Sequence, residues 1–153
     1  MIKAVIFDMD GVIVDSEPIH FESDQLTLKH FGIEASHEEL NQYVGVTNPV
    51  MWADLKRKHN LVASVEALLE KQSYYKNYLF GIKKLEPIAG IPDLLAEIKN
   101  AGAKLGLASS SNRDFIEMVL MNLGIMDYFD MIVSGDEVKK SKPDPEIFLK
   151  AAG

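Results

Sequence analysis

The chain has 153 residues, enough for one compact domain or for a domain that carries an insertion. Its net charge of −7, without a cluster of Lys or Arg, argues against a nucleic-acid surface, and the absence of cysteine excludes disulfides and thiol catalysis. No apolar run approaches the ~18 residues of a membrane span, and two acidic residues, Asp8 and Asp10, interrupt the run near the N-terminus. We therefore expect a cytoplasmic protein with neither a signal peptide nor a membrane partner.

Three short apolar runs predict strands that are buried on both faces. They are residues 2–7 (IKAVIF), 103–109 (AKLGLAS) and 129–135 (FDMIVSG). Helical patterns alternate with these runs: one begins at Pro92 and ends at Gly102, one carries Phe115 and Val119, and one starts near Pro145. Strands that alternate with helices imply right-handed crossovers, so the predicted fold class is α/β with a parallel sheet of about three strands.

The segment between the first two strands contains helix signals only. Ser36 and Glu39 form a capping box, and Ser64 precedes a further helix. A connection of about 70 residues is far longer than an ordinary loop. We therefore expect residues 16–85 to form a helical cap over the carboxyl edge of the sheet, with residues 1–15 and 86–153 as the core.

Two carboxylates, Asp8 and Asp10, follow the first predicted strand directly. An Asp before Gly is common in turns, so a purely local role is the alternative. However, the carboxyl edge of an open α/β sheet is where ligands bind. Mg²⁺ takes oxygen ligands, typically one or two carboxylates with phosphate oxygens. Asp8 could attack phosphorus while Asp10 transfers a proton at the oxygen across the bond.

The second predicted strand ends in the hydroxyl-rich stretch ASSSN, residues 108–112. A helix N-terminus follows, and its N–H groups and dipole favour an anion. Ser111 with Asp114 resembles a capping box, which would leave Ser109 and Ser110 to bind phosphate. Asn112 closes the stretch and is a further candidate phosphate ligand.

A lysine, Lys142, follows the third predicted strand in the stretch KKSKPDPEIF. Pro143 restricts the backbone of Lys142 to extended conformations and so sets its direction. A lysine at this edge can neutralise a carboxylate and a phosphoryl group in one pocket. Lys139 and Lys140 are interpreted as surface residues.

Together these pieces resemble the haloacid dehalogenase superfamily, in the β-phosphoglucomutase-like subgroup with a helical cap. FDMDGVIVDSEP, LASSSN and KPDPEIF resemble its first three motifs in order and separation. The resemblance implies that Asp8 is the nucleophile, Asp10 the acid and base, and Ser109 and Lys142 the phosphoryl-binding residues. It also implies Mg²⁺ bound by the carboxylate of Asp8 and the backbone carbonyl of Asp10, and a small phosphorylated metabolite, often a sugar phosphate, as substrate.

The fourth motif of the superfamily, an acidic stretch at the end of a further strand, has no counterpart before the last residue, Gly153. Asp136 and Glu137 precede Lys142, so they are interpreted as loop acids rather than as substitutes. We expect a truncated chain whose first strand is an exposed edge. Such a chain would bind Mg²⁺ weakly, turn over poorly and self-associate through that edge, whereas the longer parent would be a monomer.

The motifs are shared between phosphatases and β-phosphoglucomutases. Ser16 and His20, in DSEPIH, are candidate substrate contacts at the cap linker, and His20 resembles a mutase feature. Asn48 stands where the mutase pattern has an arginine, and a neutral amide cannot make the same bidentate phosphate contact. Asn112 and Arg113 also differ from that pattern. We therefore favour a Mg²⁺-dependent phosphatase, with a mutase or an inactive truncated module as alternatives.

Overall fold

The computed structural model describes all residues from Met1 to Gly153. The chain forms two compact units. Met1–Ser16 and Lys83–Gly153 form the sheet unit, and Glu17–Ile82 forms the helical unit. No helix combines the length and the hydrophobicity that crossing a membrane requires.

The sheet unit is built on three parallel strands in the order β1-β2-β3. The strands are β1 (Ala4–Phe7), β2 (Lys104–Ala108) and β3 (Met131–Val133). They lie inside the three predicted runs but are shorter than those runs. The α/β class and the parallel sheet are thus confirmed.

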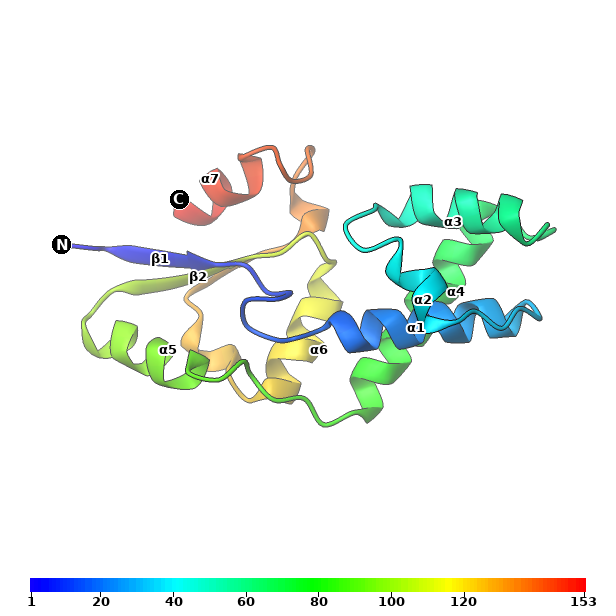
Figure 1. The fold of residues 1–153 in the computed structure, drawn as a ribbon. Coiled ribbons are helices and arrows are strands. Elements are labelled where there is room, and N and C mark those ends of the chain that lie inside the picture. Colours follow the sequence, from blue (N-terminus) through cyan, green and yellow to red (C-terminus); the bar gives the residue numbers. More distant parts are fainter. The chain divides into compact units, whose positions relative to one another are not determined.

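Helices of the sheet unit lie against this sheet (Figure 1). They are α5 (Ile91–Asn100), α6 (Arg113–Leu123) and α7 (Glu146–Ala152), with the 3₁₀ turns η1 (Met126–Tyr128) and η2 (Gly135–Glu137). Ile147 of α7 is buried against Ala108 of β2 and Val133 of β3. This packing places the start of α7, and the loop before it, beside the ends of β2 and β3.

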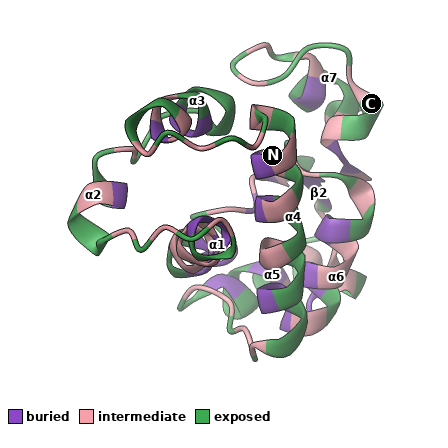
Figure 2. Cartoon of the chain, turned by 90° about the vertical axis from the view of Figure 1, so that its right-hand side faces the viewer, coloured by how far each residue is buried: buried purple, intermediate pink, exposed green.

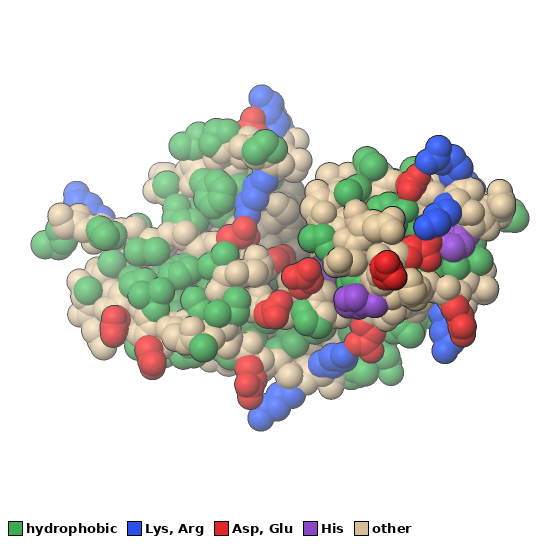
Figure 3. Space-filling view, viewed as in Figure 1, with side chains coloured by type: hydrophobic (Ala, Val, Ile, Leu, Met, Phe, Trp, Pro, Cys, Tyr) green, Lys and Arg blue, Asp and Glu red, His purple; other side chains and the backbone are tan.

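One edge of the sheet is open, because β1 pairs with β2 alone. Met1 and Ile2 are exposed, and a pocket of about 340 Å³ lies between them and α5, where Leu94 and Ile98 line it. Hydrophobic side chains gather over this part of the sheet unit (Figure 3). An edge strand offers unpaired N–H and C=O groups to another strand. Self-association through β1 stays a prediction.

The helical unit contains only helices and their connections. They are α1 (Glu17–His30), α2 (His37–Asn41), α3 (Asn48–Lys58) and α4 (Val65–Ile82). Buried and exposed residues alternate around these helices (Figure 2), and the buried ones form a core that includes Leu28, Trp52 and Leu68. The predicted caps at Ser36 and Ser64 are present, since their hydroxyls accept the N–H groups of Glu39 and Ala67.

One partly buried acid, Asp24, lies where α1 packs on α4. Its Oδ1 accepts a hydrogen bond of 2.6 Å from Nε2 of the buried Gln72. Burial raises the pKa of Asp24 from 3.8 to about 6, although the Gln72 hydrogen bond and the basic side chains of His20 and Lys76 oppose this rise. A carboxylate that is harder to ionise in the fold than in the unfolded chain destabilises the fold once it is charged.

Asp24→Asn is expected to raise the free energy of unfolding near neutral pH by up to about 3 kcal/mol. Asparagine keeps the acceptor for Gln72 and removes the buried charge. The fold favours the protonated form of Asp24. The stability of the unmodified protein that depends on this proton is therefore fully present below pH 3.8 and is lost as the pH rises to about 6. Urea unfolding of both proteins should therefore show a gain near pH 7.5 that shrinks toward about pH 4. An equal gain at both pH values would contradict the assignment.

Candidate active site

The acidic loop after β1 holds two carboxylates in different surroundings. Asp8 Oδ1 accepts hydrogen bonds from the Met9 N–H (2.8 Å) and the Lys142 ammonium (2.9 Å). Asp10 Oδ1 accepts one from the hydroxyl of the buried Ser16 (2.7 Å). No hydrogen bond or ion pair within the protein uses Asp8 Oδ2, so this oxygen is available to a ligand.

A tight turn sets the direction of these two side chains. Gly11 adopts a φ of 74°, a left-handed conformation that glycine adopts without strain, and its N–H donates to the Val14 carbonyl (2.8 Å). The buried Met9 accepts the N–H of Ile13 at 2.9 Å. The alternation along the chain therefore buries Met9 and leaves Asp8 and Asp10 at the end of the strand.

The hydroxyl-rich turn after β2 is anchored to β3. The N–H of buried Ser109 donates to the Val133 carbonyl (3.1 Å), and Ser109 Oγ accepts the Ser111 N–H (3.3 Å). Because Oγ acts as an acceptor in that contact, its O–H remains able to donate. Ser110 is exposed, and its side chain has no partner in the protein.

The prediction that Ser111 caps the following helix is wrong. Asn112 is the N-cap residue of α6, and its Oδ1 accepts the Phe115 N–H at 2.8 Å. The N–H of Ser111 donates to Ser109, and the carbonyl of Ser111 accepts the N–H of Gly135 at 2.8 Å. These two bonds hold Ser111 one residue before the N-cap position. The carbonyl oxygen of the Asn112 side chain is therefore engaged by the helix.

Lys142 joins the ends of two strands. Its ammonium group lies 2.9 Å from Asp8 Oδ1 and donates to the carbonyl of Ala108 at 3.1 Å. It also lies 5.0 Å from the centre of the Phe148 ring. These contacts bring the predicted lysine to the predicted aspartate and to the residue before Ser109. A cation at this point offsets the charge of Asp8 and of an approaching anion.

A glycine that the sequence analysis did not single out, Gly135, shapes the same region. A Cβ at this position would lie 2.1 Å from the carbonyl oxygen of Ser110 and 2.8 Å from its carbon. Only a residue without a side chain lets the loop after β3 lie against the turn after β2. The SG pair at the end of the third apolar run was the available sequence signal.

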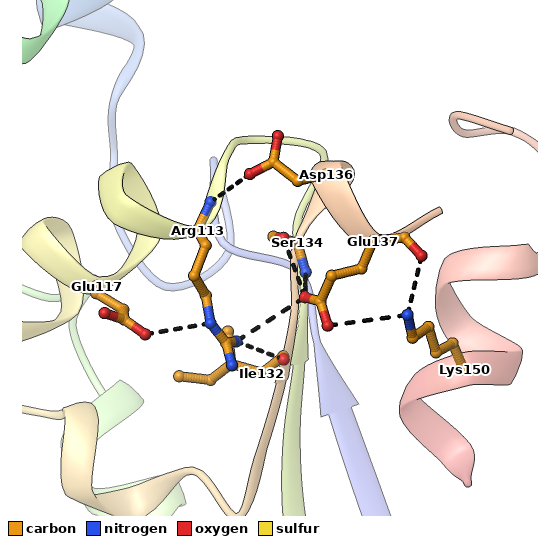
Figure 4. Close-up of polar contacts among 7 residues, drawn as sticks. All are labelled: Arg113, Glu117, Ile132, Ser134, Asp136, Glu137 and Lys150. Atoms are coloured by element: carbon orange, nitrogen blue, oxygen red, sulfur yellow. Dashed lines mark hydrogen bonds and ion pairs between the residues drawn. The ribbon is translucent and has the colours of Figure 1, made fainter. Parts of the chain in front are cut away.

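The loop acids have structural partners, as Figure 4 shows. Glu137 accepts the N–H (2.7 Å) and the hydroxyl (3.0 Å) of Ser134, and the N–H contact is the main reason why the pKa of Glu137 lies below its ordinary value. Asp136 accepts the Arg113 N–H at 2.9 Å, and the Arg113 guanidinium donates to the Ile132 carbonyl. The Lys150 ammonium of α7 donates to the Glu137 carbonyl at 2.9 Å, so these contacts together hold β3, α6 and α7 to one another.

Two predicted cap-linker residues fall in different units. Ser16 belongs to the sheet unit and bonds to Asp10, whereas His20 belongs to the helical unit, where its ring lies 6.1 Å from that of Phe80. Asn48 is the first residue of α3, and Thr47 is its N-cap residue.

The oxygen donors at this edge of the sheet limit which metal ion could bind there. No group of three or more His, Cys, Asp or Glu side chains in the structure could hold one. Mg²⁺ needs only one or two carboxylates when phosphate oxygens and water complete its shell. The Asp8 carboxylate and the Asp10 backbone carbonyl, the two ligands that the resemblance implies, fit that smaller requirement.

The fold and the site define a class of protein: an α/β enzyme with paired carboxylates, a lysine and a hydroxyl-rich turn at the carboxyl edge of a parallel sheet. Residues 5–152 match the family described as haloacid dehalogenase-like hydrolase. The chain belongs to this family, which confirms the predicted resemblance.

Named relatives agree with the predicted enzyme class. The chain is 34% identical over 152 residues to the phosphorylated carbohydrates phosphatase of Thermotoga maritima, covering 96% of this chain and 68% of that protein. It is 33% identical over 159 residues to the beta-phosphoglucomutase of Bacillus subtilis, covering 98% and 68%. Among solved structures, CbbY from Rhodobacter sphaeroides in complex with phosphate superposes with a TM-score of 0.80 at 25% identity, covering 99% and 71%.

Proposed function

We propose that this protein is a Mg²⁺-dependent phosphohydrolase that acts on a small phosphorylated metabolite, a sugar phosphate being the favoured class. The observation that carries the proposal is the contact of Lys142 with Asp8, at the point where the acidic loop and the hydroxyl-rich turn meet. The family, and relatives that include a phosphorylated carbohydrates phosphatase, support it.

The chemistry follows from the groups in place. Asp8 Oδ2 attacks phosphorus, and the bond from phosphorus to the leaving oxygen breaks as Asp10 donates a proton to that oxygen. Water then gives a proton to Asp10 and attacks phosphorus, and the bond from phosphorus to Asp8 breaks. Inorganic phosphate leaves, Asp8 is again a carboxylate, and Asp10 again carries the proton that it donated in the first step. Lys142 and the Ser109 hydroxyl hold the phosphoryl oxygens during both transfers. Mg²⁺ held by Asp8 and Asp10 would offset the repulsion between the carboxylates and the anionic substrate.

A β-phosphoglucomutase is the second candidate. His20 and the 33% identity to the Bacillus subtilis enzyme favour it. Against it, Asn48 is neutral, and the Arg113 guanidinium is engaged by Ile132 and Glu117, at 3.1 Å from Glu117. Neither Asn48 nor Arg113 therefore offers a free positive charge to a second phosphate group of a mutase substrate.

The assay that separates the candidates uses β-glucose 1-phosphate and a panel of other sugar phosphates. We expect release of inorganic phosphate that requires Mg²⁺ and is abolished by EDTA, with little glucose 6-phosphate formed. Glucose 6-phosphate as the main product would favour the mutase. Absence of both products across the panel, in folded protein with Mg²⁺, would contradict the proposed function.

A further inference from the structure

A second pocket of about 220 Å³ is lined by Lys142 and by residues of the loops after β2 and β3. Neither Asp8, Asp10 nor Ser109 lines it. Its lining includes two cations, two hydroxyls and two apolar side chains: Lys139, Lys142, Ser110, Ser141, Val138 and Ile147. A water molecule takes about 30 Å³, so the space holds a small oxyanion with part of its hydration shell.

Apart from Lys142, the polar side chains of this pocket (Lys139, Ser110 and Ser141) make no hydrogen bond or ion pair within the protein. The ammonium of Lys139 has no ion pair, unlike that of Lys140, which lies 3.7 Å from Asp144 Oδ2. The hydroxyls of Ser110 and Ser141 have no hydrogen bond within the protein. Glu146 uses its two carboxylate oxygens to accept the N–H groups of Lys139 and Lys140, both at 2.9 Å. The remaining donors therefore favour an anion.

We propose that this pocket is a second oxyanion site that shares Lys142 with the reaction centre. An anion bound by Lys139, Ser110 and Ser141 also attracts the Lys142 ammonium, which otherwise lies 2.9 Å from Asp8 Oδ1. Occupancy of the pocket weakens that contact. This consequence rests on the proposed function: free phosphate or sulfate slows turnover through the second pocket as well as by competition at the phosphoryl position.

The test is a sulfate titration of ¹⁵N-labelled protein followed by NMR, because binding is then observed without turnover. We expect the amide signals of Gly135 and Val138 to report the pocket and those of Met9 and Gly11 to report the acidic loop. Lys139→Ala should weaken the affinity reported by Gly135 and Val138 at least about tenfold, the loss of one charge-assisted contact, whereas the direct response of Met9 and Gly11 to sulfate at the phosphoryl position should persist. Lys140→Ala is the matched control, since the neighbouring lysine is paired and does not line the pocket.

The outcomes separate the two proposals. Unchanged sulfate affinity at Gly135 and Val138 in Lys139→Ala, or no response of these signals in the unmodified protein, overturns the second site. Inhibition of turnover by sulfate should likewise weaken in Lys139→Ala and persist in Lys140→Ala. A protein without phosphatase activity that still binds sulfate in the pocket would contradict the proposed function while supporting the site.

Discussion

Replacing Asp8 by Asn is expected to lower the rate of phosphate release by more than about 10³-fold, because the amide is a poor nucleophile and the covalent step is lost. The amide oxygen can still accept the Met9 N–H and contact Lys142, so the acidic loop should keep its conformation. The variant should therefore unfold at nearly the same urea concentration as the unmodified protein. The measurements are steady-state phosphate release and urea unfolding.

A second readout ties this effect to the covalent step. Intact-mass analysis after a brief reaction with acetyl phosphate should detect a phosphorylated chain in the unmodified protein and none in Asp8→Asn. Asp127→Asn is the control, since Asp127 is an exposed acid on η1, away from the acidic loop. If Asp8→Asn released phosphate at a rate close to that of the control, Asp8 would not be the nucleophile.

Gly135→Ala is expected to have the largest effect on stability. Its new methyl group would meet the backbone of Ser110, at 2.1 Å from oxygen, where no side-chain rotation can relieve the contact. The two loops must separate, at a cost of at least about 1–3 kcal/mol, typical of overpacking. The separation also displaces Ser109 and Ser110, so phosphate release should fall together with the urea midpoint.

The chain offers a matched control for this substitution. Gly81 lies within α4, where an added Cβ meets no atom within 4 Å. Gly81→Ala should therefore stabilise the protein, by up to about 1 kcal/mol, through helix propensity. A urea midpoint of Gly135→Ala equal to that of the unmodified protein would show that the loops are not held as closely as the structure indicates.

Local patterns in the sequence predicted much of the fold. Apolar runs gave the three strands, because a strand buried on both faces leaves a continuous signal. Ser36 and Ser64 marked helix starts because a capping hydroxyl bonds to an N–H only three residues away. The contact between Lys142 and Asp8 followed from chain order, since parallel strands bring their carboxyl ends to one edge.

Other features depended on neighbours that are distant in the sequence. The sequence by itself determined that Asp8, Asp10, Ser109 and Lys142 gather at one edge of the sheet, through the order of strands and turns. Tertiary structure alone decided that Asn112 caps α6, because Gly135 and Ser109 hold Ser111 in hydrogen bonds. It also decided that burial against α4 raises the pKa of Asp24. The close approach of two backbone segments and the desolvation of a side chain arise only when separate elements pack together. A local sequence pattern therefore cannot predict them.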